Sequence, residues 1–113
     1  MSNEAIARFE TLLASGKDGA LLRFGLGMQY LAAGDAARAI EHLRAAVTFD
    51  PAYSAAWKLL GRARVESGDP ARARRAWSDG IAAAARAGDV QAQKEMRVFL
   101  KRLDRGSGET KDD

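Results

Sequence analysis

The side chains that most often carry catalysis or bind metals are scarce in this sequence. The 113 residues include no cysteine and a single histidine, His42, which follows Glu41. One histidine without a cysteine or a second histidine forms neither a zinc site nor a nucleophilic triad. The Gly25-Leu26-Gly27 run has no strand before it, so it lacks the context of a phosphate-binding loop. We therefore expect no catalytic residues, no metal site and no cofactor.

Two groups of side chains are better suited to binding a partner. Helical spacing places Phe24, Met28 and Leu31 on one face of a predicted helix, and it places Lys58, Arg62 and Val65 on the equivalent face of a later one. The first group offers an apolar anchor in which methionine adapts to irregular shapes. The second offers cations that pair with a carboxylate. This pattern predicts a partner with an apolar anchor near an acidic group or a C-terminal carboxylate.

Apolar stripes and cap residues predict the elements that position these groups. Three Gly-Asp pairs, which begin at Gly34, Gly68 and Gly88, each supply a glycine that ends one helix and an aspartate that caps the next. Pro51 stops one helix and Pro70 opens another. The predicted helices cover residues 3–15, 19–33, 36–49, 52–67, 70–87 and 89–104. The helix over 19–33 is apolar on two sides, so one side meets a further element or stays open.

The sequence repeats with a period of 34 residues. Leu26 returns as Leu60, and Gly34 returns as Gly68. Two longer series at the same spacing are Ala5, Ala39, Ala73 and Phe9, Leu43, Trp77. A period of this size is typical of helical-repeat arrays, in which each helix pair buries its apolar face only by stacking on its neighbours. Trp57 and Trp77 fall in this register, so we expect both in the core.

The repeated segment resembles the tetratricopeptide repeat. The matching positions in the first copy are Leu26-Gly27, Tyr30, Gly34-Asp35, Ala39, Leu43, Ala46 and Pro51, and in the second copy Trp57, Leu60-Gly61, Gly68-Asp69, Ala73 and Trp77. The resemblance implies an all-α fold in which antiparallel helix pairs stack as a short right-handed superhelix. It also implies a concave groove, lined by the first helix of each pair, in which such proteins usually bind peptides or partner helices.

The repeat register divides the chain and assigns the groove. The division is a half repeat over 1–18, repeats over 19–52 and 53–87, and a capping helix over 88–105, which together form one domain over 1–105. The polar tail over 106–113 has no apolar anchor, so we expect disorder there. By the resemblance, the groove-facing residues are Leu21, Phe24, Met28 and Leu31 in the first repeat and Ala55, Lys58, Arg62 and Val65 in the second.

Some positions depart from the repeat pattern. Arg23 and Arg64 replace a large apolar and an aromatic residue, and Gly80 replaces an alanine, so we expect a looser second repeat. The interior glycines Gly27 and Gly61 each cost about 1 kcal/mol relative to alanine. We expect them to admit a close approach of the next helix through its small alanines.

The net charge of +3 is unevenly distributed. Residues 1–57 carry five bases and six acids, whereas residues 58–105 carry twelve bases and six acids. A basic half attracts acidic partners, but a solvated outer surface explains the same composition. No aromatic-and-glycine signature of single-strand recognition accompanies the arginines, so nucleic acid is disfavoured. No apolar run is long enough to span a membrane, and no membrane contact is expected.

These observations favour one function and leave two alternatives open. The favoured function is a non-enzymatic scaffold or adaptor for protein–protein interaction, which binds a peptide or a partner helix in the concave groove. The first alternative is a self-associating module, a homo-oligomer or a chain whose own last helix fills the groove. The second is an acidic or nucleic-acid partner bound by the basic second half. The absence of cysteine is compatible with a reducing compartment, and we expect a cytoplasmic protein.

Overall fold

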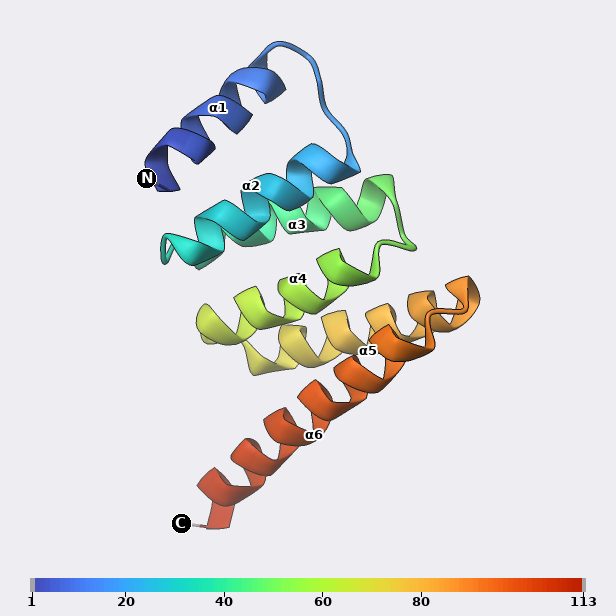
Figure 1. Cartoon of the computed structure of the whole chain (residues 1–113). Helices are drawn as coiled ribbons and strands as arrows, with labels where there is room; N and C mark the ends of the chain where they lie inside the picture. Colours follow the sequence, from blue (N-terminus) through green and yellow to red (C-terminus); the bar gives the residue numbers. More distant parts are fainter. Residues whose placement is uncertain (1, 113) are drawn as a thin grey trace.

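The structure is a computed structural model that describes residues 2–112, and every regular element in that range is a helix (Figure 1). The helices are α1 (Ser2–Ala14), α2 (Ala20–Ala32), α3 (Ala36–Phe49), α4 (Ser54–Glu66), α5 (Pro70–Ala87) and α6 (Val90–Asp112). They alternate in direction and stack one after another, with α3 behind α2 and α5 behind α4 in this view. The predicted all-α stack of antiparallel helix pairs is confirmed. Within the described residues, no helix has both the length and the apolar character needed to cross a membrane.

Aspartate caps begin α3 and α5 as the sequence predicts. Asp35 and Asp69 each accept a hydrogen bond from the backbone N–H three residues later, at 3.0 Å and 3.1 Å. The glycines before them, Gly34 and Gly68, have φ values of 82° and 81°. A residue with a Cβ is strained in this left-handed conformation, so glycine is favoured at both turns. The two turns therefore reverse the chain at the same point of each repeat.

Large side chains of the next helix, not small ones, pack against the interior glycines Gly27 and Gly61. A Cβ built on Gly27 would lie 2.5 Å from Cγ of Leu43, and one built on Gly61 would overlap the indole of Trp77. The predicted close approach of the next helix is therefore present, but the alanines expected there are not the residues that fill the space. Spacing along a helix indicates a close neighbour, whereas side-chain direction decides which neighbour it is.

The last helix docks on α5 through a second apolar cluster. Met96 of α6 is fully buried, and the ring centroid of Phe99 lies 5.2 Å from that of Trp77. Gly80 makes room for this contact, because a Cβ there would lie 2.5 Å from Sδ of Met96 and 2.7 Å from Cβ of Trp57. The looser packing expected from Gly80 is therefore wrong: the absent side chain lets α6 pack closely.

The last helix also continues beyond its predicted end. The sequence predicts a helix over 89–104 and disorder from Gly106. In the structure the backbone is helical from Val90 to Asp112, so the helix runs past residue 104, and Asp113 lies outside the described residues. The disorder expected over 106–113 stays a prediction.

Candidate partner-binding groove

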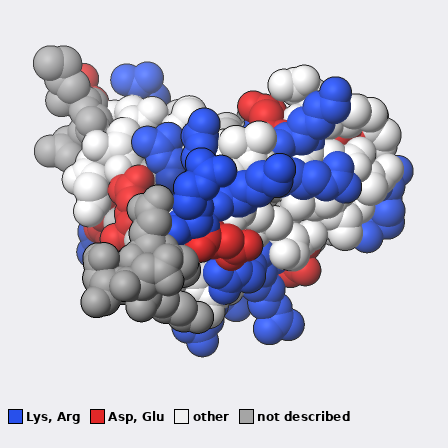
Figure 2. All heavy atoms as spheres, turned by 90° about the horizontal axis from the view of Figure 1, so that it is seen from below, with Lys and Arg blue, Asp and Glu red and all other residues white. Residues whose placement is uncertain are grey.

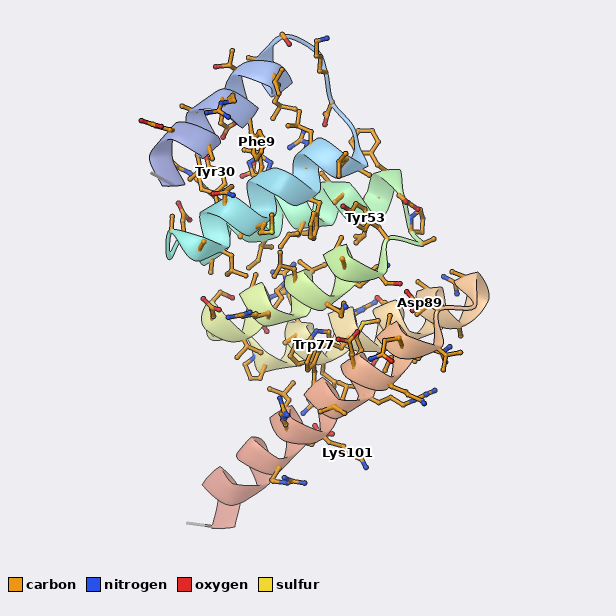
Figure 3. The ribbon with its side chains drawn as sticks, viewed as in Figure 1. Phe9, Tyr30, Tyr53, Trp77, Asp89 and Lys101 are labelled. Atoms are coloured by element: carbon orange, nitrogen blue, oxygen red, sulfur yellow. The ribbon has the colours of Figure 1, made fainter. Side chains whose placement is uncertain are left out.

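A groove follows α2, α4 and α6, which lie on one side of the stack. Its two halves, of about 450 Å³ and about 700 Å³, both include Phe24 and Met28, so the groove is continuous across α2. The larger half also receives Phe9 from α1 and Tyr53 from the turn before α4 (Figure 3). The smaller half is closed on its far side by Phe99 and other residues of α6.

The structure brings most of the predicted site residues together. Those that line the groove are Leu21, Phe24, Met28, Ala55, Lys58 and Arg62. Spacing alone identified their face because α2 and α4 are regular helices in the same repeat register. Their role in binding stays a prediction.

Two predicted residues do not line the groove. Leu31 is only 9% exposed and belongs to the same buried cluster as Leu60 and Ala63 of α4. Val65 is exposed but lies outside the residues that line either half. Both residues occupy the expected stripe, but they stand near the C-terminal ends of their helices. The spacing of residues along a helix predicts which face they share, but it does not predict which of them a neighbouring helix buries.

The apolar end of the groove is left uncovered. Leu21 is 76% exposed and Met28 is 44% exposed. Phe24 is half-buried, and its ring centroid lies 4.9 Å from that of Tyr53, which braces it from the side. Contiguous exposed apolar side chains on a protein surface mark contact sites. This end therefore has the character of an anchor site.

The cations at the basic end of the groove differ in how closely they pair with acidic side chains. Lys58 Nζ lies 3.0 Å from Oε1 of Glu95, and Arg62 Nε lies 3.4 Å from Oε2 of Glu66 one turn later. Arg102 of α6 joins them, and no ion pair links it to an acid within the part of the chain that the structure describes. Sequence reasoning missed Arg102, because α6 departs from the 34-residue register and no groove position could be assigned on it.

The last helix lines the groove without closing it. Among the described residues, α6 packs on α5 and α4 and makes no backbone contact with α2. Met28 therefore keeps its exposure, and the alternative in which this helix folds over the apolar end is not the arrangement found. A second copy of the chain stays open as an occupant.

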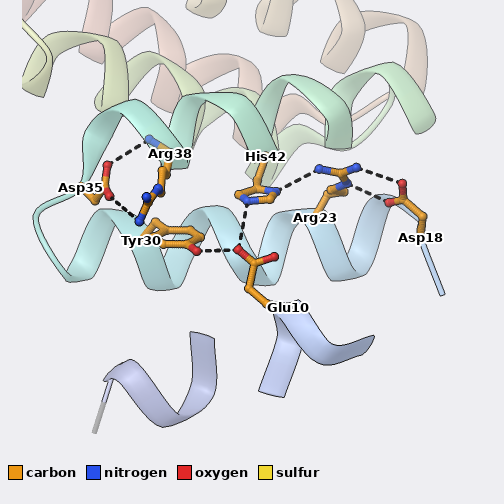
Figure 4. A network of polar contacts seen from close by, with 7 residues as sticks. All are labelled: Glu10, Asp18, Arg23, Tyr30, Asp35, Arg38 and His42. Carbon is orange, nitrogen blue, oxygen red and sulfur yellow. Dashed lines mark hydrogen bonds and ion pairs between the residues drawn. The ribbon is translucent and has the colours of Figure 1, made fainter. Parts of the chain in front are cut away.

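The single histidine belongs to a polar cluster away from the groove (Figure 4). His42 is 5% exposed, and its ring is stacked on Tyr30 at 5.4 Å between centroids and 3° between planes. Tyr30 Oη donates to Oε2 of Glu10 at 2.5 Å, while Arg23 Nη1 donates to Nδ1 of His42 at 3.0 Å. Arg23 also pairs with Asp18 at 2.8 Å. The cluster joins α1, α2 and α3 and explains how an arginine replaces the expected apolar residue at position 23.

The geometry assigns the neutral tautomer of His42. A guanidinium only donates hydrogen bonds, so Nδ1 must accept, and Nε2 carries the proton and faces Glu10 Oε2 at 3.9 Å. Burial lowers the pKa of His42 below its ordinary 6.5, Arg23 lowers this pKa further, and Glu10 opposes the shift. This arrangement holds α1, α2 and α3 together.

We predict that the free energy of unfolding decreases as the pH is lowered, because of His42. The unfolded chain takes up the imidazole proton more readily than the folded chain, so unfolding is favoured as pH drops below about 6.5. Above that pH the group has no effect. Urea unfolding between about pH 8 and about pH 5 should show this loss in the wild type and a smaller one in His42→Gln. The same loss in both proteins would mean that another group titrates.

The register, the fold and the groove together define a helical-repeat protein. A family model described as tetratricopeptide repeat matches residues 30–94, and a second model of the same description matches residues 2–54. The chain belongs to the tetratricopeptide repeat family, as the sequence predicts. Tetratricopeptide repeats are generally protein–protein interaction modules.

Two known proteins are similar to this chain over most of its length. A TPR repeat-containing protein of Pseudomonas aeruginosa is 62% identical over 100 residues, which cover 88% of this chain and 95% of that protein. The solution structure of a protein from Bordetella parapertussis matches with a TM-score of 0.78 and 50% sequence identity, and it covers 89% of this chain and 88% of its own. Neither name states a partner.

Proposed function

We propose that this chain is a non-enzymatic scaffold or adaptor that holds a segment of a partner protein in the groove along α2, α4 and α6. The observation that carries the proposal is the uncovered apolar end, where Met28 and Leu21 stay exposed beside Phe24. Membership of a family of interaction modules supports it. The cytoplasmic location expected from the absence of cysteine stays a prediction.

The groove also suggests which partner chemistry fits. An apolar side chain of the partner would pack against Phe24 and Met28, and an acidic group beyond it would meet Arg102 and Arg62. Lys58 contributes less, because Glu95 already compensates it. An exposed ion pair adds only about 0–1 kcal/mol, so the apolar contact supplies most of the affinity and the cations fix the direction of the segment.

We expect Met28→Glu to abolish capture of the groove-bound partner. A carboxylate introduced at the centre of the groove would be desolvated by a bound apolar side chain, which should weaken binding by about tenfold or more. Because Met28 is 44% exposed, the variant should fold. The measurement is capture from the native host's lysate, followed by titration of the identified partner with each purified variant.

Phe49→Glu is the matched control for this test. Phe49 is 54% exposed at the end of α3 and does not line the groove. A partner retained by wild type and Phe49→Glu but lost by Met28→Glu supports the proposal. Equal capture by all three proteins would place the partner elsewhere. A dimer that forms with rising concentration and is lost only in Met28→Glu would assign the groove to a second copy.

A further inference from the structure

The polar cluster of the first helix interface has a repeat-equivalent in the second interface, with different chemistry. In the first, Glu10 accepts the hydrogen bond of Tyr30 beside the ring of His42. The residues 34 positions later are Arg44 and Arg64 in place of Glu10 and Tyr30. The carboxylate and the phenol that bond to each other in one interface are thus two guanidiniums in the next. These cannot satisfy each other, because both only donate hydrogen bonds.

Both arginines line a cavity of about 550 Å³ between α3, α4 and α5. The cavity and the groove lie on opposite sides of the stack, because different faces of α4 line them. Leu60 and Arg64 line the cavity, whereas Lys58 and Arg62 line the groove. The arginines of the cavity are Arg44 from α3, Arg64 from α4, and Arg72 and Arg75 from α5. Its floor includes the apolar residues Val47, Leu60 and Ala76.

The positive charge of the cavity is poorly compensated within the chain. Arg72 pairs with Asp69 at 2.8 Å, but no ion pair joins Arg44, Arg64 or Arg75 to an acid in the described range 2–112. Among the described residues, Asp79 is the only acid that lines the cavity. Four guanidiniums against these two carboxylates leave about two positive charges at neutral pH.

Arg64 occupies the least favourable position among these cations. Its side chain is partly buried, and this burial, together with the charges of Arg44 and Arg72, lowers its pKa, while Asp69 opposes the shift. Seen from below, lysine and arginine side chains form a band across the middle of the molecule, with acidic side chains next to it (Figure 2). A surface patch of this kind attracts anions from a distance, and the cavity provides a place where several donors converge on one.

We infer that this cavity binds an external oxyanion of the phosphate class, which supplies the negative charge that the first interface obtains from Glu10. A phosphate monoester carries about −1.5 to −2 charges at neutral pH, which matches the uncompensated charge better than a single carboxylate does. Guanidiniums bind phosphate oxygens through paired hydrogen bonds. The volume exceeds the needs of the phosphate group alone, and the apolar floor accommodates an organic portion. The inference is independent of what the groove holds.

The test uses inorganic pyrophosphate as the probe and compares two substitutions on the same helix. Arg64→Gln removes a cation from the cavity, and Arg62→Gln makes the same change of charge on the groove side of α4. At constant ionic strength set with chloride, the wild type should bind pyrophosphate saturably at one site. Binding should weaken by about tenfold in Arg64→Gln, as expected for a lost charged hydrogen bond, and stay within about twofold in Arg62→Gln.

Two further measurements test whether weaker binding reflects unfolding and which kind of phosphate compound binds. Without phosphate, Arg64→Gln should melt no lower than the wild type, because the substitution relieves repulsion, and so weaker binding would not reflect unfolding. The absence of saturable binding, an equal loss in both variants, or duplex DNA binding without saturable pyrophosphate binding would overturn the inference. Competition with a phosphoserine peptide separates two sources: tighter binding of the peptide indicates a phosphorylated protein, and tighter binding of pyrophosphate indicates a free phosphate compound.

Discussion

Trp77→Ala should lower the free energy of unfolding by about 3–5 kcal/mol, a large share of the total for a domain of this size. Trp77 is 6% exposed and fills the space left by Gly61 of α4. Its Nε1 donates to the carbonyl oxygen of Lys58 at 3.0 Å, and its ring contacts Phe99 of α6. The substitution would therefore remove a contact shared by three helices. Urea unfolding followed by circular dichroism measures the loss.

Trp57→Ala is the appropriate comparison. Trp57 is half-buried, and its Nε1 donates to the carbonyl oxygen of Pro51 at 2.7 Å, close to the turn before α4. Since less of its surface is removed from water, its truncation should cost less than that of Trp77. Losses of equal size would contradict the central position that we assign to Trp77.

Gly80→Leu should destabilise the docking of α6 by about 1–3 kcal/mol or more. The added Cβ would overlap the space of Sδ of Met96 and of Cβ of Trp57, and the latter is held close to the α4 backbone. The Met96 side chain can shift, but relief of the contact with Cβ of Trp57 requires α4 and α5 to move apart. Unfolding measurements on Gly80→Leu, Met96→Ala and the double variant form a double-mutant cycle.

The cycle distinguishes overpacking from a simple loss of helix stability. If Met96 is the clashing neighbour, the double variant should lose less stability than the sum of the two single losses. Gly106→Ala provides the control, because a Cβ at Gly106 would meet no atom within 4 Å beyond its neighbouring residues and its own helix backbone, and alanine is the better helix former. It should be neutral or slightly stabilising. Strict additivity in the cycle would show that Gly80 does not serve to admit Met96.

Features set by local chemistry could be predicted from the sequence. The predicted bounds 36–49 and 70–87 coincide with α3 and α5, since each of these helices begins after an aspartate cap and ends at a proline or glycine signal. The periodicity of apolar residues likewise identified the side of α2 that carries Phe24 and Met28. These signals act within one helix or one turn, where a single sequence contains the whole cause.

Features set by the geometry between helices could not be predicted. The exposure of Val65 and the burial of Leu31 depend on how far each neighbouring helix extends. Arg102 enters the groove because α6 packs at an angle that no repeat register specifies. The arginine cavity could not be predicted for a related reason. Its arginines are spread along the sequence from Arg44 to Arg75, and they come together only when α3, α4 and α5 pack.

The order in which the helices stack also bears on how the molecule opens. Each helix packs mainly on the next one in sequence, and the backbone of α1 contacts that of α2 alone among the described helices. Detaching a terminal helix disrupts a single main interface, whereas detaching an internal one disrupts two. Amide protons of α1 and α6 are therefore expected to exchange with solvent sooner than those of α3 and α4. We therefore expect structure to be lost from the ends inward. A partner bound across α2, α4 and α6, as proposed above, would slow this loss at α6 by contacting all three helices.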